Sequence, residues 1–558
     1  MAETVGRIYS NFRGADFRGE EINLMRSPDC LNVWKDYKET ESIRTRPGMA
    51  QVSPYAAVVY GIFEYRGSLM IHEGTRLRKR TGTSEITIYT KMAQKPSQAF
   101  VYEDIFYIKD GENYLQYDGT TVKAVEGYVP TTTIARKPMG GGTKYEDVNM
   151  ISDRRKNSFL ADGVSFDFFL DVINIDEDFV PIVTVNDVVA DPSTYEVFYD
   201  DGRIMFKNTP PDSPETEGRD NVIIEFKKAV PKYKNAILKC TLLQVFDNRV
   251  FFSGNDEFPN VLWHCSLNDP TYVADLDYYR EGMDSAAIKG LVAGNNALWV
   301  FREPSSANTT VFYHTPTIDS EYGKIYPSSH SSITTGCVGK AINFNDDIVF
   351  FSERGMEGIN GDVTTEQVVA HRSSLVDRKL ISEADYRKML LEEWEGYLMV
   401  FVGNKVFLAD SRSVFTNENH VEYEWFYWEL EKNVTCTFVH NGVLYLGTAD
   451  GMYTLSDMTA DVESYWVTPK DKFKYPHKLK TTNKRGCVAE ATGDISVYAK
   501  LEDTDFELIG RYENVTDYFV SRIKRKKFKD IQLKFYSQTR FSLETVTLEC
   551  FIGGYVKR

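Results

Sequence analysis

Residues 241–282 of this chain, TLLQVFDNRVFFSGNDEFPNVLWHCSLNDPTYVADLDYYREG, hold the pattern that decides the fold. An apolar run at 242–246 meets the polar pair Asp247-Asn248, and a second apolar run follows at 250–252. Short β-branched and aromatic runs on both sides of an Asx-rich pair are typical of a β-hairpin with a two-residue turn. The stretch therefore predicts two antiparallel strands joined by a tight turn.

The chain repeats this hairpin pattern. From residue 248 onward, successive turn pairs lie roughly 46–50 residues apart, a period typical of a β-propeller with one four-stranded sheet per blade. A ring of such sheets buries the apolar faces that a single sheet would expose. We expect an all-β protein with a β-propeller of about seven blades, with six or eight blades and a set of unrelated hairpins as the alternatives. The other six turn pairs are Arg66-Gly67, Glu103-Asp104, Asn295-Asn296, Asn345-Asp346, Glu395-Gly396 and Asn441-Gly442.

One gap in the period indicates an insertion. The turn pairs at 104 and 248 are 144 residues apart, which leaves about 100 residues beyond one ordinary period. The extra residues begin near three glycines at 140–142, and apolar and polar residues alternate in them as in β-strands. Both features are typical of a tolerated β-domain insertion. The predicted organisation is an extended N-terminal arm at 1–50, a propeller at 51–136 and 233–457, an inserted small β-sandwich or barrel at 137–232, and a C-terminal β-sandwich at 458–558.

Three segments carry more detailed expectations. The arm is expected to wrap the propeller or a neighbouring subunit, because it contains apolar residues such as Leu31 and Trp34. The basic segment at 76–80 is expected on a charge-protected edge strand. The segment at 380–396, with Ser382 as N-cap, is expected to be helical.

Composition limits the class of protein. The net charge of −16 argues against a protein that coats DNA through phosphate contacts, although an acidic channel wall would let a duplex slide. The seven cysteines are scattered, without a CxxC pair, which fits reduced thiols better than a disulfide framework. The chain shows neither a signal core nor an apolar run of the roughly 20 residues that a membrane span needs, so no membrane anchor is expected.

The sequence contains no motif that assigns chemistry. HExxH, GxSxG, P-loop and GxGxxG patterns are missing, and no histidine lies at zinc-ligand spacing from another ligand. The acidic triplet Asp176, Glu177 and Asp178 lacks the fixed spacing of a calcium loop. We therefore expect no enzyme, no catalytic residues, no cofactor and no metal, while a carboxylate pair from different blades stays open.

One charge run is a candidate docking site. In the stretch SRIKRKKFKD at 521–530, cations cluster in an otherwise acidic chain. Such a run suits phosphate contact or docking on an acidic partner, and a solvated hairpin tip is the competing interpretation. The candidate residues are Arg522, Lys524, Arg525, Lys526, Lys527 and Lys529.

Several stretches resemble a known family. They are RGADFRGEEINLMRSPDCLNVW (13–34) with SIRTRPG (42–48), NRVFFSGNDEFPNVLWHCSLNDPTYVADLDYYREG (248–282), and SSHSSITTGCVGK (328–340) with NDDIVFFSERGMEGING (345–361). They resemble the packaged-DNA stabilisation proteins of short-tailed phages, also called tail hub or nozzle proteins. The inserted strands also resemble small β-domains of phage tail proteins.

The resemblance implies a structural subunit of the virion tail, assembled in the host cytoplasm. Six copies would form a ring below the portal and its adaptor, close the DNA channel, retain the packaged double-stranded DNA and conduct it on ejection. Tail fibre, spike or needle proteins would be further partners.

Two other functions compete with the tail hub. A receptor- or glycan-binding propeller at the tail tip predicts exposed aromatic side chains such as Trp263 or Trp428. A glycoside-cleaving or lyase propeller needs carboxylates that converge at one mouth of the ring.

Overall fold

The structure is a computed structural model. It describes residues 3–19, 22–38, 42–307, 309–320, 323–361, 363–417, 420–458, 461–524 and 527–555. The chain divides into two compact units, one formed by residues 1–90 with 331–558 and the other by residues 91–330. Both units are built almost entirely of strands, and seven four-stranded antiparallel sheets among the described residues have the topology of propeller blades. The fold class is therefore all-β and propeller-like, and the seven four-stranded sheets agree with the expected number of blades.

The first unit contains four of the blades. Three of their innermost strands are neighbours, since β8 lies against β43 and β43 lies against β39, and the fourth sheet contacts the next one through β38 and β42. The four sheets are β8 (Val59–Tyr65), β9 (Ser68–Glu73), β10 (Arg76–Thr81) and β11 (Ser84–Tyr89); β35 (Ala341–Phe344), β36 (Asp347–Ser352), β37 (Gly355–Asn360) and β38 (Val368–His371); β39 (Leu390–Trp394), β40 (Tyr397–Val402), β41 (Lys405–Asn417) and β42 (His420–Glu429); and β43 (Cys436–His440), β44 (Val443–Gly447), β45 (Gly451–Ser456) and β7 (Gly48–Pro54).

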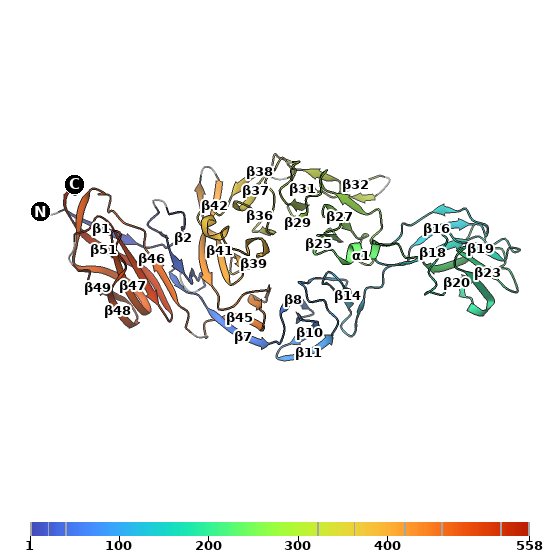
Figure 1. The fold of residues 1–558 in the computed structure, drawn as a ribbon, viewed down its shortest axis with the longest axis horizontal. Helices are drawn as coiled ribbons and strands as arrows, with labels where there is room; N and C mark the ends of the chain where they lie inside the picture. Colours follow the sequence, from blue (N-terminus) through green and yellow to red (C-terminus); the bar gives the residue numbers. More distant parts are fainter. Residues whose placement is uncertain are drawn as a thin grey trace. The chain divides into compact units, whose positions relative to one another are not determined.

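The last of these blades is completed by the beginning of the chain. Strand β7 pairs antiparallel with β45, from Gly48 opposite Ser456 to Pro54 opposite Gly451, and Figure 1 shows the two strands side by side. The fourth strand of this sheet therefore comes from a segment that precedes all other blade strands in the sequence.

The second unit contains the other three blades. Strand β25 lies between β12 and β29, so the innermost strands are again neighbours. The sheets are β12 (Gln98–Tyr102), β13 (Ile105–Lys109), β14 (Tyr114–Tyr117) and β15 (Val122–Ala124); β25 (Leu242–Phe246), β26 (Arg249–Ser253), β27 (Val261–His264) and β28 (Tyr278–Arg280); and β29 (Ile288–Gly294), β30 (Ala297–Arg302), β31 (Val311–His314) and β34 (Ser328–His330). The hairpin β32 (Thr317–Asp319) and β33 (Gly323–Ile325) extends from the third of them.

Between β15 and β25 the chain forms two further sheets with a core of their own. Phe159, Phe168, Val183, Ile204 and Phe226 are buried in that core. The larger sheet contains β17 (Thr143–Lys144), β16 (Thr131–Arg136), β18 (Arg154–Phe159), β24 (Val222–Lys227), β20 (Ile182–Val185) and β21 (Val188–Val189), and the smaller one β19 (Asp167–Phe169), β23 (Arg203–Phe206) and β22 (Tyr195–Phe198). These are the inserted sheets.

The end of the chain forms a ten-stranded sheet, here called the C-terminal sheet. Its central strand β47 (Lys478–Leu501) pairs with β51 and β49 in its first half, and with β50 and β48 in its second half. One long strand therefore connects two sets of partners, as in a β-sandwich. The other strands are β46 (Ser464–Val467), β48 (Glu507–Val515), β49 (Tyr518–Ser521), β50 (Ile531–Ser537), β51 (Phe541–Tyr555), β1 (Thr4–Tyr9), β4 (Cys30–Leu31), β5 (Val33–Lys35) and β6 (Ile43–Thr45).

The N-terminal arm therefore belongs to this sheet as well as to the blades. Strand β1 pairs with β51 and β4 pairs with β46, while the short parallel pair β2 (Gly14–Ala15) and β3 (Arg26–Ser27) lies against β42. The arm was expected on the propeller or on a neighbouring subunit. The structure shows that it also joins the C-terminal sheet of its own chain. The prediction missed this pairing because the sequence gives no local sign of such distant partners.

Buried polar contacts fix the arm to β42. The guanidinium of Arg26 donates to both carboxylate oxygens of Glu424, at 2.8 and 2.7 Å, and both side chains are buried. The indole of Trp428 donates to the carbonyl of Val33 at 3.1 Å. Trp34 packs between Trp394 and Trp428, so the arm, a blade and the C-terminal sheet share one core.

Two local expectations were wrong. The segment 380–396 forms no continuous helix: α2 (Asp377–Leu380) and the 3₁₀ turn η2 (Tyr386–Lys388) are followed directly by strand β39. Basic residues 76–80 lie in β10, which is paired on both sides with β9 and β11 and is not an edge strand. Helix α1 (Tyr233–Leu238) and the turn η1 (Pro192–Thr194) complete the described helical segments, none of which is long and apolar enough to cross a membrane.

Candidate docking surface on the C-terminal sheet

The basic run at 521–530 continues from strand β49. Its described residues alternate between inside and outside: Ile523 and Phe528 are buried, whereas the side chains of Arg522 and Lys524 are exposed. Apolar side chains thus fix the backbone to the core while the cations face solvent. The exposed cations therefore have a defined support, which a loose hairpin tip would lack.

Lys480, a buried residue of β47, holds the second half of the run in place through hydrogen bonds. Its ammonium group donates to the carbonyls of Lys529 and Tyr475, at 2.5 and 2.6 Å. Its backbone exchanges two hydrogen bonds with Phe528, at 2.8 and 3.0 Å. Burial lowers the pKa of Lys480, and the nearby charges of Asp530 and Asp471 act against that shift. Because the side chain of Lys480 is fully buried, it serves to position the loop.

Four of the six candidate residues fall within the described residues. Arg522, Lys524, Lys527 and Lys529 are all exposed, and no carboxylate among the described residues forms an ion pair with any of them. Arg525 and Lys526 lie outside the described residues. Within the described ranges, no ion pair therefore neutralises these four cations.

A fifth cation, Arg485, lies outside the run in sequence but next to it in the fold. Gly486, at φ +77°, lies directly against the run: a Cβ placed on it would be 2.3 Å from the carbonyl of Ser521 and 3.1 Å from the Cα of Arg522. The preceding residue, Arg485, is exposed. The pairing of β47 with β49, in which Cys487 lies opposite Ser521, brings these segments together, so no spacing in the sequence could have shown it. The basic patch is defined here as Arg485, Arg522, Lys524, Lys527 and Lys529.

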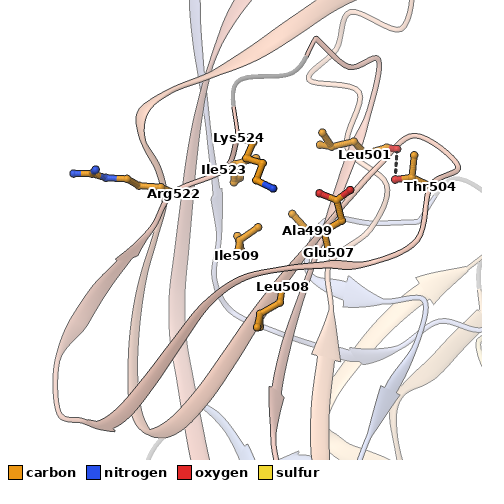
Figure 2. Close-up of a pocket in the computed structure, with 9 residues that line it drawn as sticks. All are labelled: Ala499, Leu501, Thr504, Glu507, Leu508, Ile509, Arg522, Ile523 and Lys524. Atoms are coloured by element: carbon orange, nitrogen blue, oxygen red, sulfur yellow. Dashed lines mark hydrogen bonds between the residues drawn. The ribbon is translucent and has the colours of Figure 1, made fainter.

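A pocket of about 160 Å³ lies beside the basic patch. Its apolar lining comes from the end of β47, the start of β48 and the run itself, and its polar lining includes Lys524 and Glu507. Figure 2 shows Lys524 and Glu507 extending toward each other across the pocket while Arg522 points away from it. Thr504 closes the β47–β48 turn by donating to the carbonyl of Leu501 at 2.9 Å. The apolar lining residues are Ala499, Leu501, Leu508, Ile509 and Ile523.

The charge of the C-terminal part differs from that of the rest of the chain. Residues 458–558 contain 19 Lys and Arg against 14 Asp and Glu, which gives a net charge of +5. Residues 137–232 contain 11 Lys and Arg against 19 Asp and Glu, a net charge of −8. The basic patch therefore lies in a cationic segment of a chain whose total charge is −16.

The aromatic residues named for glycan binding are buried. Trp263 is 4% exposed, and Trp428 is fully buried in β42. The neighbouring residues 424–427 of the same strand are buried as well. The glycan-binding alternative thus loses the observation on which it mainly relied.

Other titratable groups cluster inside the blades. His371 lies between two carboxylates, with Nδ1 3.2 Å from Glu357 and Nε2 2.5 Å from Asp377. In the second unit, His314 Nε2 is 2.9 Å from Glu281, and both side chains are fully buried. Each cluster has internal partners for its charges and serves to position blade strands. Within the described ranges, no group of three or more His, Cys, Asp or Glu side chains is placed to hold a metal ion.

Comparison with protein-family models and with curated proteins finds no match. One similar solved structure is BamB from Moraxella catarrhalis, with 12% sequence identity and a TM-score of 0.33; the match covers 73% of this chain and 97% of BamB. Another is Hsv2 from Kluyveromyces lactis, with 7% identity and a TM-score of 0.31; the match covers 82% of this chain and 99% of Hsv2. A glycoside hydrolase is also among them (8%, 90% and 100%, TM-score 0.22), and it neither supports nor excludes catalysis by this chain. At these TM-scores the likenesses carry no inference about substrate, partner or activity.

Proposed function

We propose that this chain is a ring-forming structural subunit of a bacteriophage tail, a tail hub or nozzle. Six copies would surround the channel below the portal and adaptor, retain the packaged double-stranded DNA and conduct it on ejection. The family resemblance of the arm and blade segments suggests this role. Enzymatic activity is not part of the proposal.

The observation that carries the proposal is the set of apolar side chains that the inserted sheets expose. Met139, Val164, Val188 and Val189 are 66–73% exposed, and Ile173 and Val180 are also exposed. We take these exposed apolar side chains of one small domain as part of a surface that another protein covers. A subunit that must contact ring neighbours, adaptor proteins and fibre, spike or needle proteins needs such surfaces.

The acidic balance of the chain supports the same role. A channel wall without strong phosphate contacts would let duplex DNA slide through the ring. The receptor- or glycan-binding alternative has no comparable support, since Trp263 and Trp428 are buried.

The test is the assembly state of the purified full-length protein, alone and mixed with portal and adaptor rings. Sedimentation should give the mass of a hexamer in at least one condition, and electron microscopy should show a six-fold ring whose central hole admits duplex DNA. A protein that stays monomeric in every mixture would overturn the proposal.

A further inference from the structure

We propose that the basic patch and the pocket beside it bind the acidic loop at 173–180 in the inserted sheets of a second copy of this chain. The contact would join each subunit to the next in one direction around the ring. The inference rests on the proposed function because it assumes a ring of identical subunits.

Charge is the first argument for this partner. The segment that carries the basic patch has a net charge of +5, and the segment that carries the loop has a net charge of −8. Complementary potentials of this kind steer association and fix the register of two surfaces. A second copy supplies the acidic surface at the same concentration as the basic one.

The loop also offers one carboxylate that its own domain leaves unused. Asp176 accepts a hydrogen bond from the backbone of Ala229 at 2.7 Å, and Asp178 pairs with Lys227. Glu177, between them, is exposed and forms no ion pair with any described residue. It is the carboxylate that we assign to the basic patch.

Apolar side chains flank this carboxylate on the same loop. Ile173 is 62% exposed and Val180 is 57% exposed. An apolar side chain of this size suits a pocket lined by Leu501, Ile509 and Ile523. A nucleic-acid backbone would use the cations of the patch and leave the apolar lining uncovered, so the pocket favours a protein partner over DNA.

The loop is already held in one conformation. Asn174 and Ile175 donate backbone hydrogen bonds to the carbonyls of Asp200 and Tyr199, both at 3.0 Å, and Lys228 donates to the carbonyl of Asn174 at 2.6 Å. A preformed loop loses little conformational entropy on binding.

The interface would be heterologous, because it uses two different surfaces of the same chain. Interfaces of this type generate closed rings when the rotation between subunits closes. The proposed contact is therefore of the type from which a closed ring is built.

The test is a charge exchange in the full-length protein, measured by sedimentation over a concentration series in the condition in which the wild type forms rings. Arg522→Glu with Lys524→Glu should weaken association by at least about tenfold, and so should Glu177→Lys, because each places like charges opposite each other. A chain that combines all three substitutions should recover most of the wild-type affinity. The control, Lys472→Glu with Arg511→Glu, makes the same change in net charge elsewhere in the C-terminal part and should leave association unchanged. Circular dichroism and thermal unfolding confirm that each variant folds.

Three outcomes would overturn the inference. Rings that form normally after reversal at Arg522 and Lys524 would show that the patch is not the interface. Failure of the combined variant to recover would show that the loop is not its partner. If the variant with charge reversal at Arg522 and Lys524 forms intact rings but no longer binds duplex DNA, the patch is a nucleic-acid site. In each case the ring itself persists in the wild type, whereas a wild type that stays monomeric with portal and adaptor overturns the proposed function as well.

Discussion

At the scale of single residues, the seven blade hairpins depend on backbone angles that few side chains tolerate. Both residues of every turn pair have positive φ, between 45° and 77°. This is the type I′ geometry that matches the twist of the strands, and Asn, Asp and Gly adopt it at the lowest cost. Arg66, Glu103 and Glu395 occupy such positions without that advantage.

Glu103→Asn should therefore stabilise the protein. Glu103 is exposed at φ 45°, and asparagine tolerates this region better, so the gain should be about 0.5–1 kcal/mol in the free energy of unfolding. Denaturant unfolding monitored by fluorescence measures it. The same substitution at Glu217, an exposed loop residue without positive φ, should give no gain. An equal effect at both sites would contradict the backbone explanation.

Gly486→Ala should destabilise the C-terminal sheet by about 1–3 kcal/mol, since it adds a methyl group 2.3 Å from a carbonyl oxygen at a positive φ. Gly218→Ala is the matched control. Gly218 has φ +80° but no atom within 4 Å of an added Cβ, so it carries the backbone cost without the clash. Thermal unfolding of both variants separates the two effects, and equal losses would exclude the close contact as a cause.

His371 should make stability depend on pH in the alkaline range. Burial alone would lower its pKa, but hydrogen bonds and charge from Asp377 and Glu357 raise it to about 10. A raised pKa gives stability that is complete below the unfolded pKa of about 6.5 and is lost as pH rises through 10. The wild type should therefore lose more stability between pH 7 and pH 10 than His371→Gln does. Parallel unfolding curves for the two proteins over this range would contradict the assignment.

At the scale of elements, the local hairpins could be predicted because their information is local. An Asx- or Gly-containing pair between two apolar runs is sufficient, and all seven pairs proved to be hairpin turns. The helix predicted at 380–396 was wrong because it, too, was inferred from local sequence alone. Leu390, Leu391 and Trp394 fit a helical face, yet pairing with β40 made 390–394 a strand, since tertiary contacts outweigh propensity in a short segment.

The arm shows what local patterns cannot reveal. Strand β1 pairs with β51 at the opposite end of the sequence, and its register is supported by Asp471, which accepts hydrogen bonds from Arg7 at 3.0 Å and Tyr9 at 2.9 Å. No residue in 4–9 indicates that partner. Contacts between such distant segments depend on the finished fold.

Asp471→Asn should loosen β1 while the blades stay intact. The amide removes a negative charge and presents a donor to Arg7 and Tyr9, at a cost of about 1–3 kcal/mol. Hydrogen exchange followed by mass spectrometry should show faster exchange in residues 4–9 and unchanged exchange in β42. Asp503→Asn, which breaks an exposed ion pair with Lys470, should change neither. Faster exchange throughout the chain would mean that Asp471 supports the whole unit.

At the scale of the whole molecule, the seven cysteines report on global unfolding. All are free and buried, and burial raises the pKa of the Cys240 and Cys265 thiols to about 12. A thiol reagent should therefore modify none of them rapidly in the native protein and all seven after denaturation. The absorbance of the released reagent counts them. Rapid reaction of even one thiol in native buffer would show that its surroundings open locally.

The candidate site could be predicted only in part at this scale. The run at 521–530 is visible in the sequence as a cluster of cations, but the pocket beside it needs β47 and β48, and Arg485 reaches it only through strand pairing. The net charges of separate segments are readable from composition. Which surfaces face each other is a property of the folded chain.

Strand β7 completes the sheet of β43, β44 and β45, and its distance from them in the sequence affects folding during synthesis. Pro54 leaves the ribosome about 400 residues before Gly451, its partner in β45. At a translation rate of about 5–20 residues per second, β7 stays without its partner β45 for about 20–80 seconds. During this interval the nascent chain presents an unpaired strand to its neighbours on the same messenger RNA, which is a condition for pairing between chains. Slow translation or a temporary chaperone at residues 48–54 would therefore determine how much of the product reaches the correct fold.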